Sequence, residues 1–158
     1  VVNPSLTVSM NEIVQNTITL LNENIKQYDA KIIVQPDMPS VYVDSIRIQE
    51  VMNNLVENAI KFSRAKKNPL IEIGFNDLET EVQFHVRDNG MGVEARYHEK
   101  IFGLFDQLDK TFDGTGVGLS LVKRIIECHG GSIWIESEGK NKGSTFYFTL
   151  PKSHSGMP

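Results

Sequence analysis

A stripe of polar side chains runs along one predicted helix, "SIRIQEVMNNLVENAIKFS" (45–63). Glu50, Asn54, Asn58 and Lys61 recur at i, i+4, i+8 and i+11, which places them along one line on the helix surface. A carboxamide oxygen is a hard ligand that suits Mg²⁺, and a lysine one turn away can contact a phosphate. A solvated polar face has the same pattern, so the helix alone leaves both interpretations open.

A second candidate lies where a predicted strand ends, in "VRDNGMGV" (86–93). Asp88 closes the strand, and Gly90 and Gly92 follow, where a backbone without Cβ atoms lets a ligand come close. A carboxylate in this place could accept a hydrogen bond from an exocyclic amine. The alternative is an ordinary Asn-Gly turn between two strands.

Alternating glycines precede the last predicted helix, in "FDGTGVGLSLVKRIIECHGG" (112–131). Gly114, Gly116 and Gly118 allow backbone N–H groups to turn inward at a helix N-terminus, an arrangement that favours anions. No GxxxxGK[ST] motif occurs, and a loop rather than a strand comes before the glycines, so neither a Walker A loop nor a dinucleotide fingerprint is indicated. A flexible turn is the alternative.

Two phenylalanines interrupt the irregular stretch 89–116, in "KIFGLFDQL" (100–108). Long segments of this kind inside a compact domain are usually functional lids or disordered. Phe102 and Phe105 predict a short helical turn held on the core, which could also anchor a lid.

Helices and strands alternate irregularly along the sequence that carries these residues. Strands that occur in adjacent pairs indicate a mixed, largely antiparallel five-stranded sheet with three helices on one face, an α/β sandwich. Helices are expected from a Ser9 N-cap with Glu12 as its capping-box partner to about Ile25, from an Asp44 N-cap to about Ser63, and over 117–129 before Gly130. Strands are expected at 4–8, 31–35, 70–77, 81–88, 132–137 and 143–151.

Length and composition restrict the class of protein. A chain of 158 residues is most simply one domain, predicted here as residues 1–152 with a tail, 153–158, that is disordered or foreign to the protein. The net charge of −4 gives no basis for binding nucleic acid. The single cysteine, Cys128, favours a reducing compartment, and no apolar run is long enough to span a membrane. The opening "VVNPSLT" suggests a fragment of a longer protein.

In their order and spacing, the four segments resemble the catalytic, ATP-binding domain of sensor histidine kinases, which has the Bergerat fold. The wider superfamily includes gyrase, mismatch-repair ATPases and the large heat-shock chaperones. The resemblance covers residues 4–152. It is carried by "NNLVENAIKFS", similar to the N box, "DNGMGV" and "GTGVGLSLVKRIIECHGG", similar to the two glycine boxes, "IFGLFDQLD", similar to the F box, and the closing strand "GSTFYFTLP".

The resemblance implies a role for each candidate residue. Asn58 would ligate Mg²⁺, and Asn54 and Lys61, the predicted catalytic pair, would contact the phosphates of ATP. Asp88 would accept the adenine amino group, and Thr145 would support that site through a water molecule. The other residues predicted to bind ATP, several of them in a mobile lid over about 103–116, are Phe62, Gly90, Gly92, Phe102, Phe105, Lys110, Gly114, Thr115, Gly116, Val117, Gly118 and Leu119.

Two positions depart from what relatives carry. Asn54 stands where the hydrolysing members have a glutamate general base, so water attack should be slow. Gln107 stands where many kinases of the family have a lid arginine, which leaves Lys110 as the nearest cation. An amide can donate a hydrogen bond to the γ-phosphate but brings no charge.

The resemblance also implies partners. The acceptor histidine would lie on an upstream dimerisation and phosphotransfer domain, because His98-Glu99 is only faintly similar to an acceptor site and no helical hairpin surrounds it. A response regulator receiver domain would act downstream, and this domain would be cytoplasmic, without direct membrane contact, whether or not its parent is anchored.

Two alternatives stay open. The first is a module that phosphorylates serine, like anti-sigma factor kinases, or that binds ATP without transfer. The second is an ATPase that dimerises on ATP, as in mismatch repair. Asn54 counts against the second alternative.

Overall fold

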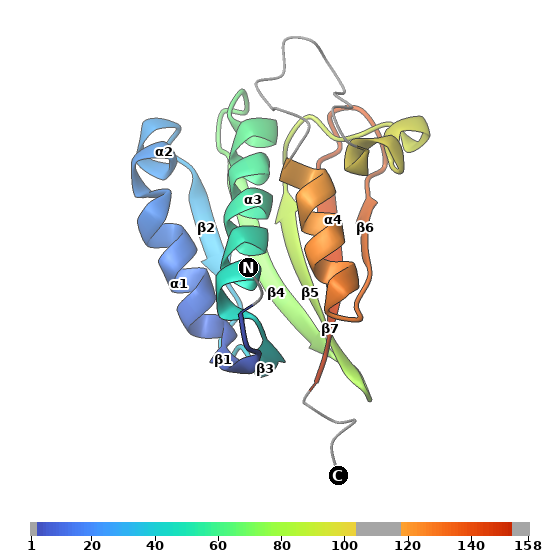
Figure 1. The fold of residues 1–158 in the computed structure, drawn as a ribbon. Helices are drawn as coiled ribbons and strands as arrows, with labels where there is room; N and C mark the ends of the chain where they lie inside the picture. The colour runs from blue at the N-terminus through green and yellow to red at the C-terminus, as the bar shows by residue number, and fades with distance from the viewer. Residues whose placement is uncertain (1–2, 104–117, 153–158) are drawn as a thin grey trace.

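A computed structural model describes residues 3–103 and 118–152 (Figure 1). In chain order its elements are β1 (Leu6–Ser9), α1 (Met10–Leu20), α2 (Asn22–Gln27), β2 (Lys31–Val34), β3 (Ser40–Val43), α3 (Ser45–Ser63), β4 (Leu70–Asp77), β5 (Glu81–Asp88), η1 (Ala95–Tyr97), η2 (Lys100–Phe102), α4 (Gly118–Cys128), β6 (Ile133–Glu136) and β7 (Ser144–Pro151). No helix in these two ranges is long and apolar enough to cross a membrane.

The main sheet has five strands in the order β2-β4-β5-β7-β6. β2 pairs with β4 in parallel, and the other three pairs are antiparallel. α1, α3 and α4 lie on one face of this sheet (Figure 1). The predicted α/β sandwich, with its mixed five-stranded sheet, is therefore confirmed.

A second, two-stranded sheet was not predicted. β1 pairs antiparallel with β3, from Leu6 opposite Val43 to Ser9 opposite Ser40. β3 has only four residues between Pro39 and the helix cap at Asp44, which is too short for a periodic pattern to stand out. The short sheet fixes where the chain enters α1 and α3.

The first helix begins where predicted, directly after its N-cap residue Ser9, but its capping box and its end need correction. Ser9 is also the last residue of β1, and its side chain makes no capping hydrogen bond. The capping box with Glu12 is therefore wrong. The helix also stops at Leu20, and a separate short helix follows Leu21, whose φ of −96° and ψ of 12° break the regular turn.

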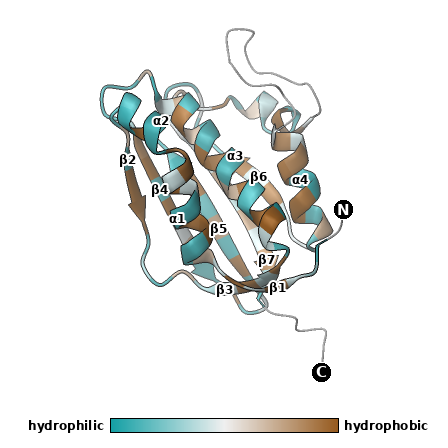
Figure 2. Cartoon of the chain, turned by 60° about the vertical axis from the view of Figure 1, so that its left-hand side comes forward, coloured by the Kyte–Doolittle hydropathy of each residue, from teal (hydrophilic) through white to brown (hydrophobic). Residues whose placement is uncertain are grey.

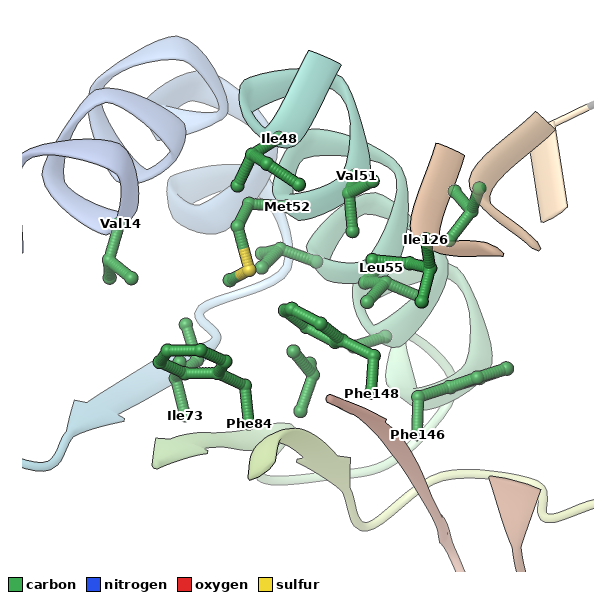
Figure 3. Packing of buried hydrophobic residues seen from close by; sticks show 14 of the residues in the cluster. Val14, Ile48, Val51, Met52, Leu55, Ile73, Phe84, Ile126, Phe146 and Phe148 are labelled. Carbon is green, nitrogen blue, oxygen red and sulfur yellow. The ribbon is translucent and has the colours of Figure 1, made fainter. Parts of the chain in front are cut away.

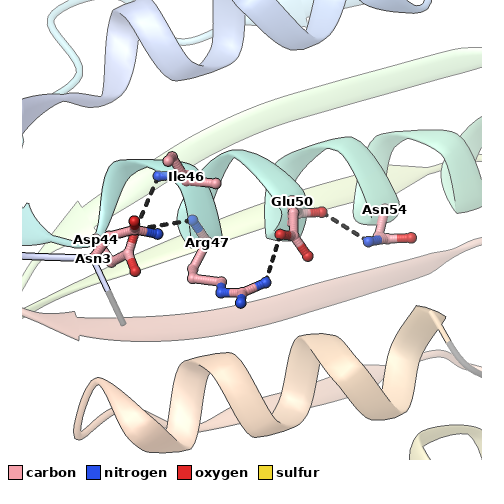
Figure 4. Close-up of polar contacts among 6 residues, drawn as sticks. All are labelled: Asn3, Asp44, Ile46, Arg47, Glu50 and Asn54. Carbon is pink, nitrogen blue, oxygen red and sulfur yellow. Dashed lines mark hydrogen bonds and ion pairs between the residues drawn. The ribbon is translucent and has the colours of Figure 1, made fainter. Parts of the chain in front are cut away.

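The predicted cap of α3 is confirmed. One carboxylate oxygen of Asp44, Oδ1, accepts hydrogen bonds from the backbone N–H groups of Ile46 at 3.1 Å and Arg47 at 3.3 Å (Figure 4). A side-chain acceptor here satisfies amides that have no partner within the helix.

The apolar face of α3 is buried against the sheet. Helical periodicity in the sequence predicts that five residues share this face, and all are at most 3% exposed: Ile48, Met52, Leu55, Ala59 and Phe62. They meet inward-pointing rings of β5 and β7, where Phe84 and Phe148 stack with centroids 5.3 Å apart (Figure 3). Hydrophobic and hydrophilic residues alternate along the helices as amphipathic packing requires (Figure 2). This packing fixes the rotation of α3 and so directs its polar stripe away from the core.

Candidate functional site

Asp88, at the end of β5, is a buried carboxylate that is only 2% exposed. Its Oδ1 accepts a hydrogen bond from the Gly90 N–H at 2.8 Å, and its Oδ2 accepts one from the Ser144 hydroxyl at 2.9 Å. Burial raises the pKa of Asp88 to about 6, although both hydrogen bonds act to lower it. The two hydrogen bonds thus hold the Asp88 side chain in one orientation as an acceptor, while its burial disfavours the ionised form.

The loop after Asp88 is fastened to the end of α3. The Met91 N–H donates to the Phe62 carbonyl at 2.9 Å, and a Cβ atom at Gly90 would collide with that same carbonyl. Only glycine therefore fits at position 90. Gly92 is buried in the same loop, next to the turn between β6 and β7. The structure so brings Asp88, both glycines and the Phe62 backbone together, and the roles of these residues in binding ATP stay predictions.

The polar stripe of α3 faces the start of α4. The Asn54 amide Nδ2 donates to the Glu50 carbonyl at 2.9 Å (Figure 4), which leaves its Oδ1 near the first residue of α4. That oxygen lies 3.0 Å from the place a Cβ atom would occupy on Gly118, the first residue of α4. A glycine at 118 therefore lets the helix N-terminus approach Asn54 closely.

Farther along α3, Asn58 and Lys61 are half-buried. Lys61 Nζ lies 3.9 Å from the Glu57 carboxylate, and the Asn58 side chain makes no hydrogen bond to any described residue. Within residues 3–103 and 118–152, no group of three or more His, Cys, Asp or Glu side chains could hold a metal by itself. A cluster of acidic side chains is not required for Mg²⁺, which is commonly held by one or two protein oxygen ligands together with phosphates and water. A single amide oxygen could be such a ligand.

The prediction for Thr145 is wrong by one residue in register. In the β5–β7 ladder Asp88 lies opposite Ser144, and Thr145 lies opposite Arg87. Successive side chains of a strand point to opposite faces, so the Thr145 hydroxyl is on the face of the sheet away from Asp88. Sequence reasoning missed Ser144. The alternation of β7, whose Phe146 and Phe148 are buried, could have identified it, since Ser144 shares their face.

The register of β7 on β5 predicts that the neighbouring hydroxyls of Ser144 and Thr145 affect the pKa of Asp88 differently. Ser144→Ala should raise the pKa of Asp88 further above its usual value, because it removes a hydrogen bond that favours the carboxylate. Thr145→Ala, the matched control, should leave that pKa unchanged. A carboxyl-detected NMR titration measures both, and a shift in the Thr145 variant alone would contradict the assignment.

The region after Gly92 is described only in part. Phe102 is buried and meets Phe146 edge-on, with centroids 6.0 Å apart, which agrees with its predicted role as an anchor. Leu119 packs half-buried against the core. Phe105, Gln107, Lys110, Gly114, Thr115, Gly116 and Val117 lie outside the described residues, as does the lid predicted there, and their roles stay predictions.

Comparison with known proteins gives the family. Residues 43–154 match the family described as histidine kinase-, DNA gyrase B- and HSP90-like ATPases. The chain belongs to this family, which explains why an acceptor carboxylate, an amide stripe and a helix N-terminus occur together on one side of an α/β sandwich.

Several of the similar proteins are named as histidine kinases. The chain is 42% identical over 151 residues to the methanogenesis regulatory histidine kinase FilI of Methanothrix harundinacea, covering 96% of this chain and 17% of that protein. It is 43% identical over 145 residues to cyanobacterial phytochrome B of Nostoc, covering 89% and 19%. The solved catalytic domain of the histidine kinase ThkA superposes with a TM-score of 0.82 at 32% identity, covering 96% of this chain and 99% of that domain. The chain thus has the fold of a histidine kinase catalytic domain and spans less than a fifth of these two longer relatives.

Proposed function

We propose that this domain binds MgATP and transfers the γ-phosphate to a histidine on a dimerisation and phosphoacceptor domain, in two-component signalling. In that reaction the bond between the γ-phosphorus and the bridging oxygen breaks, a phosphorus–nitrogen bond forms on the imidazole, and ADP leaves. The observation that carries the proposal is the Asp88 carboxylate, which is buried at the end of β5 and oriented by Gly90 and Ser144, just before the loop that is fastened to the end of α3.

Asp88 would select the base. A buried carboxylate that already receives two hydrogen bonds keeps further lone pairs for the adenine amino group, which is a donor. A guanine base would present a carbonyl oxygen at the corresponding position, and two acceptors repel. The buried site would therefore discriminate strongly, because a mismatched partner leaves polar groups unpaired.

Asn54, Asn58 and Lys61 would hold the phosphates together with the N-terminus of α4. Mg²⁺ would bind through the Asn58 amide oxygen and would supply positive charge that offsets the phosphates. Lys61 would place its ammonium on phosphate or ribose, and the α4 N-terminus at Gly118 would add backbone donors.

Asn54 would bias the site toward transfer over hydrolysis. An amide cannot remove a proton from water, so a general base for hydrolysis is lacking at this position. Its Nδ2 already donates to the Glu50 carbonyl, which orients the side chain for positioning rather than for proton transfer. Glu50 itself is engaged by Arg47 Nη1 at 2.8 Å.

Both partners are proposed from the relatives. The histidine kinase ThkA has been solved in complex with the response regulator protein TrrA, and full-length ShkA in complex with AMPPNP. A receiver domain downstream and a histidine-bearing domain upstream would be the corresponding partners of this chain. Neither nucleic acid nor direct membrane contact has a place in the proposal.

The test combines the chain with the region that precedes it in its parent protein. With [γ-³²P]ATP and Mg²⁺, we expect acid-labile, base-stable label on a histidine of the added region and none on the isolated domain. Acid-stable label on serine would favour the serine-kinase alternative, and phosphate release without protein label would favour an ATPase. Label on the isolated domain would overturn the placement of the acceptor outside it.

A further inference from the structure

The ring of His129, just after α4, joins the two helices that carry the proposed phosphate site. Its Nε2 accepts a hydrogen bond from the backbone N–H of Asp44 at 3.1 Å, and its Nδ1 lies 2.8 Å from the Ile125 carbonyl oxygen. Asp44 caps the start of α3, whereas Ile125 belongs to the last turn of α4. One side chain therefore links the N-terminus of α3 to the C-terminus of α4.

These two partners fix the protonation of the ring. A backbone N–H can only donate and a carbonyl oxygen can only accept, so both bonds require a neutral imidazole with its proton on Nδ1. In the opposite tautomer, Nε2–H would face the Asp44 N–H, which is also a donor, and the bare Nδ1 would face the Ile125 carbonyl oxygen, which is also an acceptor. The ring acts as a directional connector and needs no charge.

The link has a consequence at the other end of α4. The helix is held on α3 and the sheet by buried apolar side chains, chiefly Val122, Ile125 and Ile126. Apolar contacts are non-directional, so they tolerate small sliding or rotation of the helix. The His129 bond to the Asp44 amide is directional and sets where α4 lies along α3. Because helices are stiff, the same bond sets where Gly118 meets Asn54.

We propose that His129 is a positioning residue of the nucleotide site. It aligns the N-terminus of α4 with the polar stripe of α3. The inference rests on the proposed function, since the aligned groups are those that would hold the triphosphate. His129 itself lies at the far end of α4 from Gly118 and would not touch the nucleotide.

The bond can be tested without any nucleotide. In the wild-type domain at pH 8, long-range ¹H–¹⁵N NMR of the imidazole should show His129 protonated on Nδ1 and unprotonated on Nε2. The Asp44 amide should be protected from hydrogen exchange in the wild type and lose protection in His129→Leu. The other tautomer, or an unprotected Asp44 amide in the wild type, would overturn the inference.

The functional test compares substitutions of His129 that keep the hydrogen bond to Asp44, the hydrogen bond to Ile125, or neither. His129→Leu keeps neither bond, His129→Asn keeps a donor for Ile125 but is too short to reach Asp44, and His129→Gln offers an acceptor to Asp44. In calorimetric titrations of MgATP on folded protein, we expect the Leu and Asn variants to bind about tenfold more weakly and the Gln variant to recover most of the affinity. Cys128→Ala, an exposed neighbour, is the control and should bind like the wild type.

The outcomes separate the two proposals. If the wild-type domain binds no MgATP, the proposed function fails, and this inference fails with it. If the wild type binds and both the Leu and Asn variants bind equally well, only the positioning role is refuted. Should His129→Leu not fold, the Asn and Gln variants decide, because they differ in their reach to Asp44.

Discussion

Asp88→Asn is expected to bind MgATP at least about 100-fold more weakly than the wild type while losing no stability at pH 7. The amide introduced by this substitution could keep its oxygen on the Gly90 N–H and turn its NH₂ toward the Ser144 hydroxyl, so these two hydrogen bonds survive. The adenine amino group would then meet a donor where it needs an acceptor. Calorimetry for affinity and thermal unfolding for stability give both quantities.

The stability part of this prediction has a defined pH dependence. Burial raises the pKa of Asp88 from 3.8 to about 6, so the fold favours the protonated acid. That contribution is fully present below pH 3.8 and is lost as the pH rises through about 6. At pH 7 the wild type bears a cost of up to about 3 kcal/mol that a neutral amide avoids. The stability of Asp88→Asn relative to the wild type should therefore increase between pH 4 and pH 7.

Asp77→Asn is the matched control, because this carboxylate ends β4 on the surface, where it pairs with Lys152 at 2.8 Å. We expect it to change neither nucleotide affinity nor, beyond a few tenths of a kcal/mol, stability. A relative stability of Asp88→Asn that stays flat between pH 4 and pH 7 would show that the carboxyl is not perturbed by burial. An unchanged affinity would remove Asp88 from the base site.

The sequence predicted α3 and its two faces correctly because the helix is long and strongly periodic. Nineteen residues give the apolar face and the polar stripe enough repeats to be separated. The Asp44 cap was equally predictable, since a capping side chain and the helix it caps are adjacent in sequence. Such local signals identify each helix separately and do not show how the helices and strands pack together.

The failures come from contacts between distant parts of the chain. Ser9 occupies the N-cap position that the sequence predicted, but its side chain makes no capping hydrogen bond, and the residue is paired with Ser40 of β3. Thr145 and Ser144 are both hydroxyl residues; the alternation of β7 places Ser144 on the buried face, but only the register of β7 on β5 sets it opposite Asp88. The role of His129 depends on a backbone amide 85 residues away. Periodicity within an element cannot supply such information.

Asn58→Ala should abolish the part of ATP affinity that depends on Mg²⁺. Asn58 is the candidate metal ligand, half-buried on α3 and without a hydrogen bond to any residue that the structure describes, so its amide oxygen is available to a cation. Because the side chain makes no hydrogen bond to a described residue, its removal should leave the thermal unfolding midpoint nearly unchanged. In the wild type, adding Mg²⁺ should strengthen ATP binding, and in the variant ATP should bind about equally with Mg²⁺ or with EDTA.

Loss of the metal response with an intact fold would distinguish a ligand from a structural residue. Asn11→Ala, on the exposed side of α1, is the matched control and should keep the full response to Mg²⁺. Asn58→Asp tests the chemistry more closely, because it keeps an oxygen ligand but adds a negative charge beside the phosphates, and we expect it to bind ATP as poorly as Asn58→Ala. If folded Asn58→Ala retained wild-type affinity in Mg²⁺, the metal would have to be held elsewhere, and the α3 stripe would be a solvated helix face after all.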